Sequence, residues 1–392
     1  MSKTPATESD HLQTLPAILP SLLRGSSVSR AQIIVDQLKT AIQAGRQDLV
    51  HLLYASSADA PPAPDAVTAT VDSDTTDAAV VLIRQPPSDA ATLLAGGFLL
   101  PAADTLPAHP VVRARLAADL SRKIDRLMQA HAITFLQWAT DPVEIPITQQ
   151  DSRTSSQNVP AAKSEPAKLA GASPAEFGFE NAATLQYLSG GLDGDSATTN
   201  APDANRPAVA LHVSVVDSDN NSAVAQFSNL VGATYVGSLD CPKLSSHRTA
   251  SEIVASYRTA ASYRPGWWMT LAAADDPATP IGCLIMACHG GDHSSTAAET
   301  GANDSTDPAP VAELVYMGLL PEYRGRGLGR RIVETARATA RAAECQRMIL
   351  AVDLTNGPAV DAYQTFGMTP VMKETVWVKS VPPVADSQPS SS

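Results

Sequence analysis

A short glycine-rich run, Arg324-Gly325-Arg326-Gly327-Leu328-Gly329, is the part of this sequence whose residue types and spacing best suit chemistry. An apolar run rich in strand-forming residues precedes it, and a pattern with helical spacing follows at 332–343. A strand, a glycine turn and a helix in that order bring free backbone N–H groups and the positive end of the helix dipole to one point. Glycine also lets an anion approach the backbone without meeting a Cβ atom. The run therefore predicts a phosphate-binding site.

The spacing of the glycines excludes two common phosphate loops. A P-loop needs two glycines with four residues between them, then Lys and Ser or Thr, and this sequence has no such run. The dinucleotide fingerprint needs G-x-G-x-x-G, whereas Gly325, Gly327 and Gly329 are spaced G-x-G-x-G. Two plainer interpretations are a solvated Arg/Gly loop and a nucleic-acid-binding segment. The strongly patterned flanks argue against both.

A second patterned run follows the strand expected at 348–352. It contains Asn356, Ala359, Tyr363 and Gly367, followed by Met368. Asn356 could simply cap a helix and Tyr363 could simply be a half-buried packing residue. Together, the two runs resemble the R-x-x-G-x-G/A and N-x-x-A-x-x-x-Y-x-x-x-G-F signatures of the GNAT superfamily, the acetyl-CoA-dependent N-acyltransferases. Met368 stands where the family usually has Phe.

This resemblance covers roughly 211–378 and implies a fold, a co-substrate and a reaction. The implied fold is a mixed sheet flanked by helices, of α/β (α+β) class. The implied co-substrate is acetyl-CoA, and the acceptor would be an amine of a small molecule or a peptide. The positions that match those of the family's cofactor site are Leu319, whose neighbouring amide would hold the thioester carbonyl, and Arg324, Gly325, Arg326, Gly327, Leu328, Gly329, Arg330 and Asn356.

Acyl transfer to an amine needs groups that move protons. An amine of the lysine type has a pKa of about 10.4, so a base or a proton relay is useful at neutral pH. In the family, the residue at the position of Tyr363 often protonates the leaving sulfur. Glu313, on a strand that resembles the equivalent strand of the mycothiol synthases, is the candidate base, and Asp353 is the second candidate. The plain interpretation of Glu313 is an exposed charge at a strand end.

The elements around these residues follow from the hydrophobic pattern. Residues 267–272 and 281–288 read as a strand pair joined across a turn at 274–280. The other elements expected in this half are strands at 209–216, 314–319, 348–352 and 375–378, and helices at 222–232, at 249–260, beyond the glycine-rich run and after the strand at 348–352. Trp267 and Trp268 are expected in the core and the wall of the acceptor pocket. His289, Asp292 and His293 have a metal-like spacing, but we expect a solvated loop there and no metal site.

The first half of the chain has a similar order of elements. Helices are expected at 29–44 and 111–130, and strands at 49–55, 78–84, 91–100, 133–138 and 181–188. No R-x-x-G-x-G run precedes the second of these helices. We therefore predict two tandem copies of the fold, of which the N-terminal one is degenerate. An unrelated α/β domain is the alternative.

Composition limits the class of protein. The chain has 392 residues, a formal charge of -12 and four cysteines without C-x-x-C spacing. The acidic balance argues against nucleic acid as a partner, and the cysteines suggest neither a zinc site nor a disulfide framework. No membrane-spanning run and no signal-peptide pattern is present, so we expect a cytoplasmic monomer or homodimer.

The predicted organisation is a tail at 1–20, a degenerate domain at 21–190, a linker at 191–206, a catalytic domain at 207–380 and a tail at 381–392. Stretches rich in Ser, Asp, Ala and Pro at 56–77, 142–175 and 289–310 are expected to be flexible inserts. The predicted function is transfer of an acetyl group to a primary amine in a ternary complex. The alternatives are an acyl-CoA-binding pseudoenzyme and a scaffold role for the N-terminal half.

Overall fold

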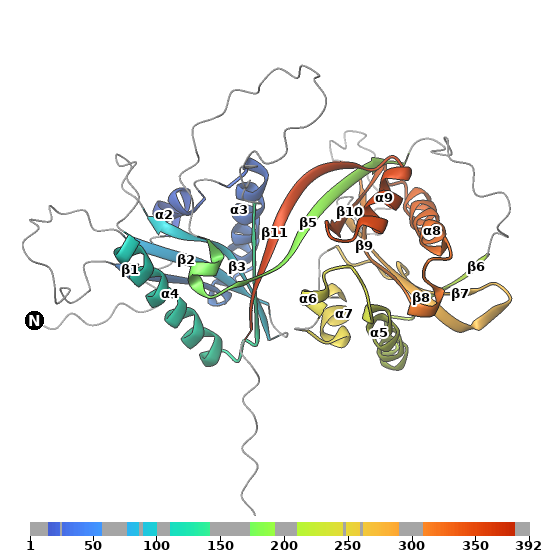
Figure 1. Cartoon of the computed structure of the whole chain (residues 1–392), viewed down its shortest axis with the longest axis horizontal. Helices are drawn as coiled ribbons and strands as arrows, with labels where there is room; N and C mark the ends of the chain where they lie inside the picture. The colour runs from blue at the N-terminus through green and yellow to red at the C-terminus, as the bar shows by residue number, and fades with distance from the viewer. Residues whose placement is uncertain are drawn as a thin grey trace, which may run out of the picture. The chain divides into compact units, whose positions relative to one another are not determined.

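Figure 1 shows the computed structural model of the chain, which describes residues 15–23, 26–56, 77–85, 89–99, 110–141, 173–192, 210–245, 248–258, 262–289 and 309–380. The chain forms two compact units. The first comprises Met1–Asn181 with Thr375–Ser392, and the second comprises Ala182–Glu374. Most residues of the three predicted inserts lie outside the described part of the chain.

The first unit has a sheet in the order β1-β2-β3-β4-β11. Its strands are β1 (Val50–Ser56), β2 (Asp77–Arg84), β3 (Ala90–Leu99), β4 (Phe135–Thr140) and the end of β11 (Thr369–Ser380). Its helices are α2 (Leu15–Leu22), α3 (Val28–Gln43) and α4 (Pro110–Ala130), with the short 3-10 turns η1 (Gln47–Leu49) and η3 (Pro174–Phe177). The amphipathic pattern predicted α3 and α4 nearly to the residue, but it did not predict α2.

The second unit has a sheet in the order β5-β10-β9-β8-β7-β6. Its strands are β5 (Glu180–Gly191), β6 (Leu211–Val215), β7 (Trp268–Ala273), β8 (Asp276–His289), β9 (Val311–Leu319) and β10 (Arg347–Asp353). Its helices are α5 (Asn221–Tyr235), α6 (Pro242–Ser245), α7 (Ala250–Arg258), α8 (Leu328–Ala342) and α9 (Gly357–Thr365), and η4 (Pro321–Tyr323) follows β9. The predicted turn at 274–280 is too long, because β8 already begins at Asp276 and pairs there with Ala273.

The two sheets repeat one local design. In the first unit the parallel ladder between β3 and β4 runs from Ala90↔Phe135 to Leu93↔Trp138 and stops there. In the second unit the ladder between β9 and β10 runs from Val311↔Arg347 to Leu314↔Leu350 and stops in the same way. The residue after each ladder, Leu94 or Val315, is the extra residue of a β-bulge toward the strand on the other side. The order of elements, the ladder and the bulge all agree, so the prediction of two copies of the fold is confirmed.

The last strand of each half pairs within the other unit. β5 directly follows the first unit in the chain, yet it pairs with β10 of the second unit from Leu185↔Asp353 to Gly191↔Arg347. The C-terminal part of β11 in turn pairs with β4 of the first unit, from Thr375↔Thr140 to Ser380↔Phe135. The units therefore divide at 181/182 and 374/375, rather than at the predicted 190/207 and 380.

The sheet of the second unit is covered on both faces. One apolar cluster joins Leu314 of β9 and Leu350 of β10 to α8, through Ile332, Val333 and Ala336. Another joins Phe227, Val231 and Val254 of α5 and α7 to Trp268 and Tyr316. Because Leu314 and Tyr316 belong to different clusters, the bulge at Val315 switches the side chains of β9 between the faces. Glu313, which alternates with Leu314, therefore lies on the face that carries α5 and α7.

In the first unit, an aromatic side chain lies at the place where β3 leaves its parallel ladder with β4. A Cβ atom placed on Gly96 of β3 would lie 2.9 Å from Cη2 of Trp138 on β4. Trp138 is 3% exposed and packs against Phe177 and Phe179, with ring centroids 5.7 and 5.4 Å apart. The indole thus lies beside the part of β3 that has left the parallel ladder. In the part of the chain that the structure describes, no helix is both long and apolar enough to cross a membrane.

Candidate functional site

The predicted phosphate site is a glycine turn at the N-terminus of α8. Gly325 and Gly327 have φ values of +69° and +77°, a backbone conformation that side chains with a Cβ atom disfavour. Gly327 caps the helix without a side-chain hydrogen bond. A Cβ atom on Gly325, Gly327 or Gly329 would meet nothing within 4 Å, so open space lies over the turn. The amide groups of 325–329 donate to no described residue, which leaves them available to an anion.

Arg324 holds this turn in place. Its Nε donates to the carbonyl oxygen of Leu319 at 3.0 Å, and its Nη2 donates to that of Thr234 at 2.8 Å. The guanidinium therefore ties the turn to the end of β9 and to the C-terminal end of α5. These bonds give Arg324 a role in shaping the turn, whatever further contact it makes with a ligand.

The other predicted side chains of the turn are arranged around it. Arg326 stacks over the ring of Tyr323 at 5.2 Å, and Arg330 lies over the ring of Phe366 at 5.6 Å. Arg330 also forms a surface ion pair with Glu334 at 3.2 Å. Leu328 is buried. Two arginine side chains thus lie on or beside the turn, where they can add positive charge to the amide groups.

The divergence of β9 and β10 opens the sheet next to the turn. Beyond Leu314 the edge of β9 that faced β10 has left the parallel ladder, so its amide groups on that side are available to a ligand. Leu319, the predicted position beside the thioester carbonyl, ends β9 and is paired with Gly282 of β8 on the other side. The divergence and the glycine turn therefore lie at the same end of β9.

Tyr363 of α9 is buried but keeps its hydroxyl unengaged. The side chain is 5% exposed and packs in the apolar cluster that contains α8. Its hydroxyl has no hydrogen-bond partner among the described residues. Burial, and secondly the charge of Asp240, raises the pKa of the Tyr363 hydroxyl above its usual value. A phenol in this state stays protonated at neutral pH and can donate a proton.

Asn356 has the structural role that its position allows. Its Oδ1 accepts a hydrogen bond from the amide of Ala359 at 3.4 Å, and the residue is the N-cap of α9. Its backbone amide donates to the carbonyl oxygen of Asp353 at 2.9 Å. Met368, in place of the usual Phe, is 2% exposed and packs in the same apolar cluster as Tyr363. Asn356 thus fixes the start of the helix that carries Tyr363.

Glu313, the candidate base, is paired with a histidine. The Nε2–H of His289 donates to Oε2 of Glu313 at 2.6 Å. This bond, opposed by burial, raises the pKa of His289 above its usual value. The sequence placed His289 in a solvated insert, and this was wrong: it is the last residue of β8 and lies beside Val311. Asp292 and His293 lie outside the described residues, and no metal-like group of three ligands occurs within them.

We expect Glu313→Gln to lower the pKa of His289, because a neutral amide does not favour the imidazolium. The pair contributes stability below the unfolded pKa of about 6.5, and this is lost as the pH rises through the raised folded pKa. The His289 side chain is 46% exposed, so that contribution is below about 1 kcal/mol. NMR titration of the imidazole protons, with His289→Asn to assign the signal, measures the pKa. If the pKa of His289 is the same in Glu313→Gln as in the unaltered chain, His289 does not pair with Glu313.

A carboxyl group that the sequence reasoning missed lies beside the second candidate base. Asp240 lies in the segment between α5 and α6, to which the sequence analysis assigned no functional residue. Its Oδ1 accepts a hydrogen bond from the amide of Asp353 at 3.4 Å. Asp353 is 2% exposed, and its own Oδ1 accepts from the amide of Thr355 at 2.9 Å. A polar residue in a turn carries no pattern in the sequence, so only the fold reveals this pair.

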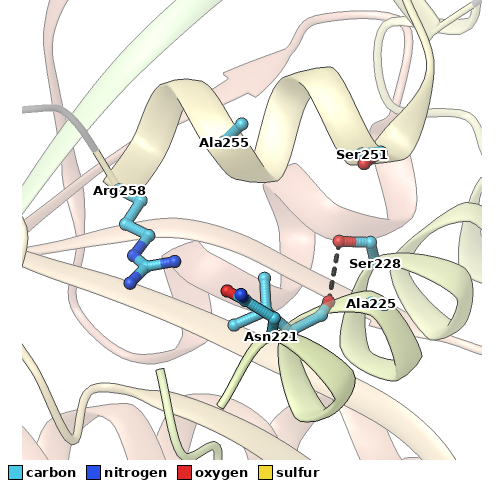
Figure 2. Close-up of a pocket in the computed structure, with 7 residues that line it drawn as sticks. Asn221, Ala225, Ser228, Ser251, Ala255 and Arg258 are labelled. Carbon is cyan, nitrogen blue, oxygen red and sulfur yellow. Dashed lines mark hydrogen bonds between the residues drawn. The ribbon is translucent and has the colours of Figure 1, made fainter. Parts of the chain in front are cut away.

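A separate groove lies between α5 and α7 (Figure 2). It has a volume of about 510 Å³, and Ser228 at its wall donates from Oγ to the carbonyl oxygen of Val224 at 2.9 Å. Its lining residues are Asn221, Val224, Ala225, Ser228, Ser251, Ala255 and Arg258. None of them belongs to the glycine turn, β9, β10 or α9, so this groove is not part of the site described above.

Comparison with known proteins agrees with this geometry. Residues 241–368 match the model of the acetyltransferase (GNAT) family. A mycothiol acetyltransferase of Corynebacterium aurimucosum is 32% identical over 111 residues, which are 27% of this chain and 35% of that protein. One of Corynebacterium glutamicum is 39% identical over 69 residues, which are 18% of this chain and 24% of that protein. The chain thus matches about a third or less of the length of these relatives.

Two solved structures share low identity with most of the chain. An N-acetyltransferase from Sphaerobacter thermophilus is 11% identical, with a TM-score of 0.41, and covers 79% of this chain and 81% of its own. A tandem GNAT protein from the clavulanic acid biosynthesis pathway is 15% identical, with a TM-score of 0.37, and covers 79% and 84%. Residues 241–368, which match the acetyltransferase (GNAT) family, contain both the glycine turn and the part of β9 that diverges from β10.

Proposed function

We propose that the second unit transfers an acetyl group from acetyl-CoA to a primary amine by direct attack in a ternary complex. The observation that carries this proposal is the glycine turn, whose amide groups are unengaged and whose three glycines face open space. A pyrophosphate fits such a turn because it accepts many hydrogen bonds and is anionic. Arg326 and Arg330 supply further positive charge, and the residues present thus fit the phosphates of coenzyme A.

The chain's own residues supply the proton transfers. The amine nitrogen forms a bond to the thioester carbonyl carbon, and the bond from that carbon to sulfur breaks. Tyr363 gives its proton to the leaving sulfur, and a backbone amide near Leu319 donates to the carbonyl oxygen. The proton lost by the nitrogen goes to Glu313, either directly or through water. His289 donates to Glu313 at 2.6 Å and orients its carboxylate. Asp353 is the second candidate for that proton.

Release of free coenzyme A is the direct test of this function. The full chain with acetyl-CoA should release thiol when a suitable amine is added from a panel of alkylamines, amino sugars and peptides with free amino groups. A pseudoenzyme would bind acetyl-CoA and release no thiol with any of them. An acceptor related to that of the mycothiol acetyltransferases belongs in the panel because of the sequence similarity to those enzymes.

We expect each chain to bind one acetyl-CoA. The first unit has the same diverging strands, but the indole of Trp138 lies against Gly96 in the opening. The second unit has Leu350 at the position of Trp138 in the parallel ladder, which is a smaller side chain. Isothermal titration of the full chain with acetyl-CoA measures the stoichiometry. Two equivalent sites would show that Trp138 does not block the first unit.

A further inference from the structure

The C-terminal end of α5 contacts the side chain of Arg324. The last carbonyl groups of a helix have no partner within the helix, and they carry the negative end of its dipole. The carbonyl oxygen of Thr234, in the last turn of α5, accepts a hydrogen bond from Nη2 of Arg324 at 2.8 Å. The chain then passes close to the guanidinium, because a Cβ atom on Gly237 would lie 3.5 Å from its Nη1. The end of α5 is therefore one of two anchors of the glycine turn, and Leu319 of β9 is the other.

The side chain of Thr234 is buried and fully hydrogen-bonded. It is 1% exposed, and its hydroxyl donates its single proton to the carbonyl oxygen of Val231 at 2.7 Å. A hydroxyl oxygen can accept two further hydrogen bonds. The Tyr316 hydroxyl therefore donates to it at 2.9 Å, and the Cys283 thiol lies at 3.8 Å, where it can donate as well. Because these bonds end at a backbone carbonyl, they hold Thr234 against β8 and β9 and do not relay a proton.

The backbone of β9 comes closest to Thr234 at Gly318. A Cβ atom on Gly318 would lie 2.4 Å from Oγ1 and 2.6 Å from Cβ of Thr234, and 2.7 Å from the hydroxyl oxygen of Tyr316. Carbon atoms in contact lie about 3.5 to 4.0 Å apart, so a side chain at 318 would push the end of α5 away from β9. Gly318 directly precedes Leu319, whose carbonyl oxygen accepts from Nε of Arg324 at 3.0 Å.

We propose that Thr234 is a positioning residue for the cofactor site. Packed on Gly318 and held by Tyr316, its residue keeps the carbonyl groups of α5 and β9 at the separation that one guanidinium bridges. Arg324 then holds the glycine turn next to the end of β9. Thr234 itself touches neither the cofactor nor the acceptor. This inference rests on the proposed function, because it names what holds the phosphate-binding turn of that site in place.

Thr234→Val and Gly318→Ala test this role in the full chain. Valine keeps the shape of threonine but leaves the buried Tyr316 hydroxyl without its acceptor. Alanine at 318 forces α5 and β9 apart. We expect each folded variant to bind acetyl-CoA about tenfold or more weakly, the effect of losing a hydrogen bond to a charged group. Isothermal titration measures the Kd, and thermal unfolding measures the Tm of the same samples.

Three further variants separate positioning from stability. Thr234→Val combined with Tyr316→Phe replaces both hydroxyl groups by apolar groups of similar shape, so it should recover most of the lost affinity. Thr234→Ser keeps the hydroxyl and should bind acetyl-CoA within about threefold of the unaltered chain. Val254→Ala is the control, because Val254 is 1% exposed and lies in the same apolar cluster as Tyr316. It should lower the Tm through the cavity that it leaves, with the Kd unchanged.

The side chain of Arg324 gives a measurement that needs no cofactor. In a chain labelled with ¹⁵N-arginine, Arg324→Lys assigns its guanidinium signals. Separate Nη signals are expected in the unaltered chain and in Val254→Ala, because two hydrogen bonds prevent rotation of the group. In Thr234→Val and Gly318→Ala these signals should merge.

The outcomes distinguish this inference from the proposed function. If acetyl-CoA binds to the unaltered chain, a Kd within about twofold of that value in either folded variant overturns the role of Thr234. If acetyl-CoA does not bind, the proposed function fails, and unchanged Arg324 signals in the two variants overturn the role. If acetyl-CoA binds but no amine releases thiol, the transfer reaction fails, and weaker binding in both variants still supports the role of Thr234.

Discussion

Gly327→Asp should abolish measurable binding of acetyl-CoA. The new side chain enters the open space over the turn, where nothing lies within 4 Å, and brings a negative charge to the place proposed for the pyrophosphate. Two unit charges 4 Å apart repel by about 4 kcal/mol at an effective dielectric constant of 20, which is roughly a thousandfold in Kd. Isothermal titration of the folded variant measures the loss.

Two controls separate charge from backbone strain. Gly329→Asp adds the same charge without the positive φ of Gly327, so it should weaken binding to a similar degree, whereas Gly329→Ala should not. Gly266→Asp introduces the same backbone strain outside the glycine turn, because Gly266 has φ +86° and open space around it. It should lower stability and leave the affinity unchanged. If folded Gly327→Asp and Gly329→Asp bind acetyl-CoA with unchanged affinity, the glycine turn does not bind the cofactor.

Tyr363→Phe should lower kcat by on the order of a hundredfold, the usual contribution of a general acid. The ring of Phe fills the same buried space, and the hydroxyl has no described hydrogen-bond partner to lose. The Kd for acetyl-CoA and the Tm should therefore stay close to those of the unaltered chain. Steady-state kinetics, calorimetry and thermal unfolding measure the three quantities.

Tyr187→Phe is the matched control for this prediction. The hydroxyl of Tyr187 donates to Oε2 of Glu374 at 2.5 Å, so its removal should cost about 1 kcal/mol of stability and leave kcat unchanged. The two variants remove the same atom from two phenols of the second unit, with opposite expected effects. A kcat of Tyr363→Phe within about threefold of the unaltered chain would show that Tyr363 only packs, since an acid contributes far more.

The local features of the fold could be predicted from the sequence because they are encoded by neighbouring residues. The glycines of the turn determine its backbone, and the apolar spacing determines the buried face of α8. The resemblance to the second family signature also singled out Asn356 and Tyr363, which the structure places at the N-cap of α9 and within that helix. The order of elements in the first half was sufficient to predict a second copy of the fold.

The features that could not be predicted depend on residues far apart in the chain. The pairing of β5 with β10 has no sequence signal, because the apolar pattern of a strand does not name its partner. The contact of His289 with Glu313 was missed because the sequence analysis assigned His289 to a flexible insert, whereas it is the last residue of β8. The role of Asp240 follows only from the folded structure, in which the segment after α5 lies against the end of β10 and accepts a hydrogen bond from the amide of Asp353. The sequence thus located the glycine turn and the start of α9, and it missed the contacts made by His289 and Asp240.

The exchange of final strands has a consequence for how the protein is made. The sheet of the first unit lacks β11 until Thr375–Ser380 have been synthesised, although all its other strands precede residue 141. During translation the edge of β4 therefore waits unpaired while more than half of the chain emerges, and an unpaired edge favours wrong pairing. A ribosome-bound chain that ends before β11 should accordingly hold an incomplete first unit. For the same reason, removal of residues 1–200 would also remove β5 from the second unit, so neither half of the gene encodes a self-sufficient sheet.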